Sequence, residues 1–171
     1  MAACFHFFAN QSDSIHQTGG TTMATVCDVT YFIIHHEKKI TNLRLNELLY
    51  YVQGIHLAVA GKPLFDEEIQ AWDSGPVVAS VYTEYHDQFG SNPVLSEQVA
   101  EPKALTLEEQ KLLEQVLQEF GSCTGFQLVA LVQKPGTPWS TARARGDHII
   151  SKKEMQDYFS KKISKEKSEK V

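Results

Sequence analysis

The histidines are the residues most able to bind a metal, but their spacing does not bring them together. His35 and His36 are adjacent, so on a helix their rings point about 100° apart and cannot both face one ion. His56 falls on the apolar face of a predicted helix, where a hydrogen-bonded core histidine is expected. The chain has no HExxH motif, no cysteine cluster and no Asp-rich loop. We therefore expect no metal site and no cofactor.

Nucleophiles and acids are also not arranged for catalysis. No GxSxG motif is present, and Ser74 stands in the segment DSGP, which we interpret as the entry to a helix. Cys27 and Cys123 lie in or beside apolar helical stretches, where we expect them to be small core residues. Acidic pairs such as Glu67–Glu68 are adjacent in sequence, and adjacency does not aim two carboxylates at one bond. The sequence predicts that this protein is not an enzyme.

Charge argues against a nucleic-acid partner. The net charge is −5, whereas nucleic-acid binders usually show a basic face. One local feature favours the alternative, because Arg143, Arg145, Lys152 and Lys153 stand close to Trp139 and could form a small basic and aromatic patch. We interpret this group as a solvent-facing cluster, so nucleic-acid binding is not expected.

The spacing of the cysteines and the hydropathy of the chain indicate where in the cell the protein is expected. The three cysteines are widely and irregularly spaced without a CxxC motif, which fits reduced thiols better than a disulfide framework. No apolar run approaches the roughly 20 residues that a membrane span requires. We expect a cytoplasmic protein with no membrane partner.

A helix predicted over Leu45–Ala60 is the element around which the rest of the chain is expected to pack. Apolar residues recur at steps of three and four along one face, and the opposite face is hardly polar. A helix that is apolar nearly all round is a buried one. Thr41 or Asn42 can cap its start, and Gly61 is placed to end it.

Further helices are predicted on both sides of this central helix, which makes the domain all-α with six or seven helices. Capping residues and apolar periodicity place them in the order given next. They follow Thr25, cover Val77–Gln88, follow Thr106 and Thr124, cover Trp139–Arg145 and follow Ser151. A minor short β pairing near residues 67–72 is the one departure from helix that the pattern allows.

The predicted domain organisation is one helical domain with two loose ends. Residues 1–22 have turn and coil chemistry and are followed by Met23, so we expect a disordered or non-native extension. Residues 23–160 form the single domain. Residues 161–171 hold five Lys against two Glu and are expected to be a basic, flexible tail.

Three segments resemble the signature of a known family. They are LRLNELLYYVQ (43–53), GKPLFDEEIQAW (61–72) and GPVVASVY (75–82). Further along, EFG (119–121) and LVALVQKPGTPW (128–139) agree with the same family in order and spacing. On these motifs the chain resembles the Panacea-domain family, a SocA-like group that includes phage-associated GepA-like proteins. The resemblance covers roughly residues 24–159.

Two positions depart from the family pattern. Glu47 stands where the family usually has a second Lys, whereas Arg44 keeps the first basic position. Val132 and Gln133 stand where the family usually has Thr-His. A partner contact that depended on those groups would have to be remade, so the partner's identity does not transfer.

The resemblance implies an interaction protein without a catalytic centre. Such domains are antitoxins of toxin–antitoxin systems, which neutralise a cognate protein toxin by direct protein–protein binding. The resemblance also leaves two alternatives: a proteolytic adapter that delivers the toxin to a AAA+ protease, and a phage-associated regulatory protein. It implies neither the toxin's identity nor the oligomeric state.

Six residues are predicted to contact the partner. Arg44, Glu47 and Tyr51 lie on the less apolar side of the central helix, and Trp72, Asp73 and Trp139 stand beside sharp turns. Tryptophan and tyrosine are common anchors of protein–protein interfaces. The alternative is that Tyr51 and the two tryptophans are buried structural residues.

Overall fold

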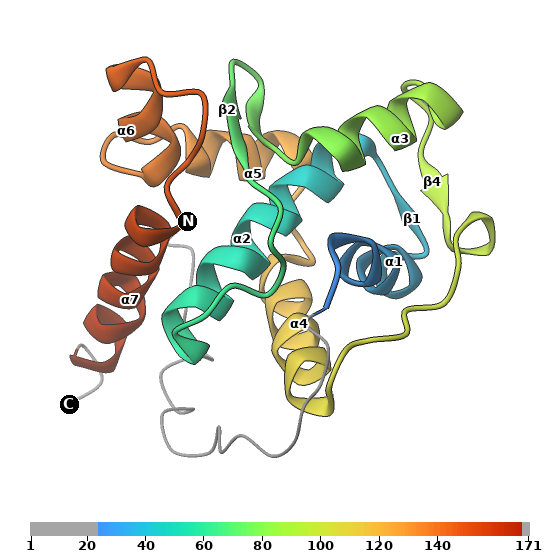
Figure 1. Ribbon diagram of the computed structural model, residues 1–171, viewed down its shortest axis with the longest axis horizontal. Helices are drawn as coiled ribbons and strands as arrows, with labels where there is room; N and C mark the ends of the chain where they lie inside the picture. Colours follow the sequence, from blue (N-terminus) through green and yellow to red (C-terminus); the bar gives the residue numbers. More distant parts are fainter. Residues whose placement is uncertain (1–23, 169–171) are drawn as a thin grey trace.

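A computed structural model describes residues 24–168 of the chain, and within them the protein is mainly α-helical (Figure 1). Seven α-helices are joined by short loops, one 3-10 turn and two small antiparallel sheets. The helices are α1 (Val26–Glu37), α2 (Asn42–Ala60), α3 (Ala79–Phe89), α4 (Leu107–Phe120), α5 (Gly125–Val132), α6 (Pro138–Arg145) and α7 (Lys152–Ser168). The strands are β1 (Lys39–Ile40), β2 (Gln70–Trp72), β3 (Gly75–Val77) and β4 (Val94–Leu95), and the 3-10 turn is η2 (Ser96–Gln98). The all-α prediction is confirmed, whereas the predicted extension 1–22 lies outside the described residues.

Helix α2 crosses the middle of the molecule, with α7 on one flank and α1 and α4 on the other (Figure 1). Every residue from Leu45 to Leu57 is buried. The Thr41 hydroxyl accepts a hydrogen bond from the Arg44 amide, and Gly61 ends the helix at φ 71°. The central buried helix predicted from the sequence is therefore confirmed, and it starts one turn earlier than Leu45.

Helix α7 packs directly on α2 at Gly54. A side chain on Gly54 would overlap the ring of Phe159, so the absence of a Cβ there allows the two helices to approach. The Phe159 ring also contacts Tyr50, with ring centroids 5.7 Å apart. Helix α7 continues to Ser168, so the first part of the segment expected to be a tail, 161–171, is helical and buries Ile163.

Side chains of α2 form hydrogen bonds with backbone groups of the loop that follows the helix. The Gln53 amide oxygen accepts a hydrogen bond from the Leu64 amide at 2.8 Å, and its nitrogen donates to the Phe65 carbonyl at 2.7 Å. His56 Nδ1 donates to the Lys62 carbonyl at 2.8 Å, and burial lowers the pKa of this imidazole. His56 is thus the hydrogen-bonded core histidine predicted from the sequence, and the loop reaches β2 in a fixed path.

The segment DSGP is the turn of a β-hairpin, which corrects the prediction that it opens a helix. Trp72 pairs with Gly75, so Asp73 and Ser74 form a two-residue turn between β2 and β3. Pro76 therefore lies in a strand, opposite Ala71, and α3 begins three residues after it. The short β pairing expected near 67–72 is confirmed at β2.

Three further observations concern the helices. The capping boxes at Thr25, Thr106 and Thr124 are all present. Cys27 is exposed on α1, so its predicted place in the core is wrong, because the buried face of that helix is formed by its neighbours Val26 and Val29. None of the helices formed by residues 24–168 has both the length and the apolar character that a membrane span requires.

Candidate partner-binding site

The tip of the β2–β3 hairpin carries Asp73 into solvent, and α6 holds one side of the hairpin in place. The Asp73 carboxylate pairs with the guanidinium of Arg143, which also donates to the Ala71 carbonyl at 3.1 Å. Trp139 Nε1 donates to the Trp72 carbonyl at 3.0 Å. Two side chains of α6 thus bind backbone groups of β2, so the hairpin has a defined position on the helical body.

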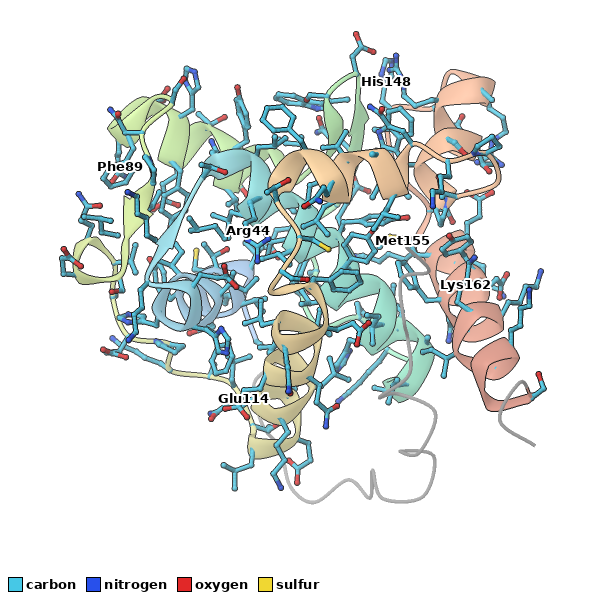
Figure 2. All side chains as sticks on the ribbon, turned by 180° about the vertical axis from the view of Figure 1, so that it is seen from behind. Arg44, Phe89, Glu114, His148, Met155 and Lys162 are labelled. Atoms are coloured by element: carbon cyan, nitrogen blue, oxygen red, sulfur yellow. The ribbon has the colours of Figure 1, made fainter. Side chains whose placement is uncertain are left out.

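A backbone segment from the loop before α7 adds a third, strand-like edge to the hairpin. The Ala71 amide donates to the His148 carbonyl at 2.9 Å, and the Ile150 amide donates to the Ile69 carbonyl at 2.8 Å. Figure 2 shows His148 at the edge of the molecule beside the hairpin. Strand β2 is therefore fixed by α6 and by residues 148–150, both of which are distant from it in sequence.

Buried asparagines of α2 fix the junction between β3 and α3. The side-chain oxygen of Asn46 accepts a hydrogen bond from the Val78 amide at 2.9 Å, and its nitrogen donates to Asn42 Oδ1 at 2.8 Å. Asn42 in turn donates to the Tyr82 carbonyl at 3.0 Å. Because Val78 precedes the first residue of α3, this network sets where the helix leaves the hairpin.

Replacing Asn46 by leucine is expected to lower the free energy of unfolding by about 2–3 kcal/mol. The substitution leaves the buried Val78 amide without its acceptor, and an unsatisfied buried group costs its full desolvation. Urea unfolding measures the total effect, and hydrogen exchange at the Val78 amide locates it. Asn92→Leu, at an exposed loop position, is the matched control and should change stability little. Equal losses in the two variants would contradict this role for Asn46.

Glu47 lies beneath the hairpin and not on the surface. Its side chain is fully buried, and neither carboxylate oxygen has a hydrogen-bond partner among the described residues. The carboxylate packs against Gly75, whose φ is 138° and where any Cβ would overlap Glu47 Oε1. Burial raises the pKa of Glu47 from its ordinary value of 4.5 to about 9, so the carboxyl group is neutral at pH 7.

Burial also corrects the prediction that Glu47, Tyr51 and Trp139 face a partner. Tyr51 and Trp139 expose only 5% and 9% of their surface. The Tyr51 ring packs on Phe120, with centroids 4.3 Å apart. The three side chains are therefore part of the core. In this conformation a partner cannot reach them without opening it.

Arg44 is paired inside the protein. Its guanidinium lies 3.0 Å from the Glu37 carboxylate and donates to the Phe120 carbonyl at 3.4 Å. Figure 2 shows Arg44 in the middle of the molecule, near the connection between α4 and α5. It thus joins α1, α2 and α4. Of the six predicted contact residues, Trp72 and Asp73 are those that the structure leaves accessible at the hairpin.

The sequence-based list missed two residues that continue the accessible surface from the hairpin onto α3. The rings of Trp72 and Tyr82 have centroids 5.0 Å apart, and Tyr82 stacks on His86 at 5.4 Å with an interplanar angle of 18°. We call Trp72, Tyr82 and His86 the aromatic strip. Trp72 and Tyr82 are half-buried, whereas His86 is exposed. The four-residue spacing of Tyr82 and His86 was the available signal, but Tyr82 also fits the apolar stripe of α3.

The basic cluster near Trp139 is paired within the protein, mostly with acids. Arg145 lies 2.7 Å from the Asp147 carboxylate and 2.6 Å from the Glu154 carboxylate. Lys153 pairs with Asp157, and Lys152 donates to a backbone carbonyl. Within residues 24–168, no three His, Cys, Asp or Glu side chains are grouped so that they could hold a metal ion. The accessible groups at the hairpin are thus aromatic and charged, with Asp73 paired to Arg143, which is chemistry for binding.

Comparison with known proteins identifies the domain that carries this site. Residues 45–140 match the family described as "Antitoxin SocA-like, Panacea domain". The chain belongs to this family. The Panacea match runs from α2 to the first turn of α6, so it includes the hairpin, the aromatic strip, Glu47 and Trp139. The family resemblance predicted from the motifs is confirmed.

A curated relative supports the same family. The chain is 31% identical over 111 residues to a protein named Antitoxin SocA from Caulobacter vibrioides (strain NA1000 / CB15N). This match covers 58% of the chain and 58% of that relative, so the chain spans little more than half of the relative's length. No solved structure matches the chain.

Proposed function

We propose that this Panacea-domain protein is an antitoxin that neutralises one cognate protein toxin by binding it directly. The observation that carries the proposal is the family match over residues 45–140, supported by the similarity to Antitoxin SocA. The proposed role is non-catalytic. We also propose a cytoplasmic location, because an antitoxin must reach its toxin where the toxin acts.

The geometry of the hairpin supports a binding role. A rigid helical body that presents a loop is a common arrangement for recognition, because the body can keep its packing while the loop suits the partner. Here α2 and α6 fix the hairpin backbone, and Asp73 and the aromatic strip remain accessible. The neighbouring polar groups are used for structure: Arg143 binds the hairpin, and Glu47 is neutral beneath it.

Co-expression tests the proposal. The proteins encoded on either side of this gene are expressed singly from an inducible promoter, with and without the chain. We expect one of them to stop growth alone, and we expect colony formation to return when the chain is present. The purified pair should elute together in size-exclusion chromatography. Leu48→Asp, which places a charge in the core, is the control and should lose rescue. A neighbour-encoded toxin that stays toxic beside abundant, folded chain contradicts the proposal.

The same strains separate direct binding from delivery to a protease. Direct binding predicts that the half-life of the toxin is unchanged after protein synthesis is stopped. A half-life that shortens with the chain, and recovers in a strain without a AAA+ protease, would replace direct binding by the adapter role.

A further inference from the structure

The segment that contains the hairpin and α3 carries acidic residues without any basic ones. Between Pro63 and Pro102 the chain has eight Asp and Glu residues and no Lys or Arg. The rest of the chain has 13 acidic and 16 basic residues, so the remainder is slightly basic. A net charge of −5 therefore conceals one strongly acidic segment, which covers β2, β3 and α3.

The structure places two of these acids beside the aromatic strip. The side chains of Asp73 and Asp87 are 87% and 72% exposed, one at the hairpin tip and one on α3 beside His86. Glu84 is exposed on the other flank of α3, toward α1, where its charge contributes to raising the pKa of Cys27, after burial as the main cause. Asp87 thus places a carboxylate beside the strip, and Asp73 places a second one at the hairpin tip, where it pairs with Arg143.

We propose that the aromatic strip and the acids beside it form a docking surface for a basic, arginine-bearing segment of the partner protein. This inference rests on the proposed antitoxin function and names the chemistry of the toxin surface that is recognised. The occupant is identified by charge complementarity, because acidic and basic surfaces steer each other into contact.

The geometry favours arginine in particular. A guanidinium group is planar, stacks on aromatic rings and pairs with carboxylates at the same time. The stacked rings of Tyr82 and His86 offer such a face, and His86 Nδ1 lies 3.7 Å from the Asp87 carboxylate. A guanidinium on these rings therefore has a carboxylate within its reach. A second copy of this face is disfavoured as occupant, since it would bring like charges together.

Nuclear magnetic resonance on the full, isotope-labelled chain tests the inference. The probe is a short Gly–Arg repeat peptide, with a Gly–Gln repeat of equal length as the neutral control. We expect the Gly–Arg peptide to shift the Trp72 indole signal and the α3 amides 82–87, and we expect higher salt to weaken this binding. The inference is overturned if the amide signals beside the acidic residues of α4 shift as much as those of α3. It is also overturned if the Gly–Gln peptide gives equal shifts.

Matched variants make the test specific. Asp87→Lys is expected to weaken Gly–Arg binding roughly tenfold, because it replaces attraction by repulsion at an exposed position. Glu114→Lys, an equal charge change at an exposed position of α4, should leave it unchanged. His86→Ala removes one ring of the strip without touching the core and should also weaken binding. Equal effects of Asp87→Lys and Glu114→Lys would show a diffuse charge effect and overturn the inference.

The growth assay separates this inference from the proposed function. If wild-type chain rescues growth and Asp87→Lys and His86→Ala rescue equally well, the toxin docks elsewhere, and the inference fails while the antitoxin role stands. If the Gly–Arg peptide binds α3 as described but no neighbour-encoded toxin is rescued, the antitoxin role fails while the acidic docking surface is supported. Loss of rescue in both variants, with rescue kept by Glu114→Lys, supports both.

Discussion

Replacing Glu47 by methionine is expected to raise the free energy of unfolding by roughly 3–5 kcal/mol at pH 8. The wild-type protein buries a carboxyl group whose two oxygens have no partner among the described residues. Burial raises its pKa to about 9, whereas the unfolded chain has the ordinary value of 4.5. Methionine fills a similar volume without a titratable group, so the cost of keeping this group neutral disappears.

The sign of the pH dependence follows from the raised pKa of Glu47. Between pH 4.5 and about 9 the folded state keeps a proton that the unfolded state has lost. The stability that this proton provides is fully present below pH 4.5 and is lost as the pH rises toward 9. The slope is about 1.4 kcal/mol per pH unit for one proton. Wild-type stability should therefore fall from pH 7 to 9, and the methionine variant should lack this fall.

Other titrating groups act outside this pH window. The lowered pKa of His56 gives stability that is lost as the pH falls through the acidic range, below pH 7. The raised pKa values of Tyr51 and Tyr85 act only above their ordinary value of 10. Cys27, whose raised pKa starts from the ordinary value of 9.0, contributes only near the top of this window, so the range from pH 7 to 8 isolates Glu47.

Urea unfolding at several pH values measures the effect. Glu47→Gln keeps the shape and removes the charge, so it should also abolish the slope, with a smaller gain because its amide is buried as well. Glu114→Met, at an exposed position, is the control and should be near neutral. A methionine variant that is less stable than wild type at pH 8, with an unchanged slope, would show that the Glu47 carboxyl has a favourable partner in solution.

The helices of this fold follow from local sequence signals. The capping boxes at Thr25, Thr106 and Thr124 and the glycine at the end of α2 act within a few residues, so one sequence contains all of their physics. The burial of α2 also follows from its composition. The helix ends and the burial of α2 were predictable because they do not depend on which distant segment packs against each helix.

The hairpin and the burial of Glu47 were not predictable in this way. DSGP fits a helix entry and a two-residue turn equally well. The choice is made by hydrogen bonds with Trp139, Asn46 and the backbone of His148, all distant in sequence. Periodicity places Glu47 on the less apolar side of its helix, but tertiary packing puts Gly75 over it. The same reasoning named Trp72 and Asp73, which are accessible at the hairpin, and missed Tyr82, whose ring contact with Trp72 joins α3 to the hairpin, and His86, which stacks on Tyr82.

Replacing Gly54 by alanine is expected to lower the free energy of unfolding by about 2 kcal/mol. Inside a helix this change normally stabilises by roughly 0.5–1 kcal/mol, because alanine loses less backbone entropy on folding than glycine. Here the new methyl group would overlap the ring of Phe159, whose side chain is fully buried between α2 and α7. Steric overlap between the two helices outweighs the gain in helix propensity.

A double-mutant cycle with Phe159→Leu tests this explanation through urea unfolding. Alone, Phe159→Leu should destabilise, because it leaves space in the core. In the Gly54→Ala background the smaller side chain makes room for the methyl group. The double mutant should therefore lose less stability than the sum of the two single losses, by roughly 1 kcal/mol or more. Strict additivity would mean that the residues do not meet. A stabilising Gly54→Ala would show that helix propensity governs this position, and that α7 does not lie against α2 as closely as the glycine contact requires.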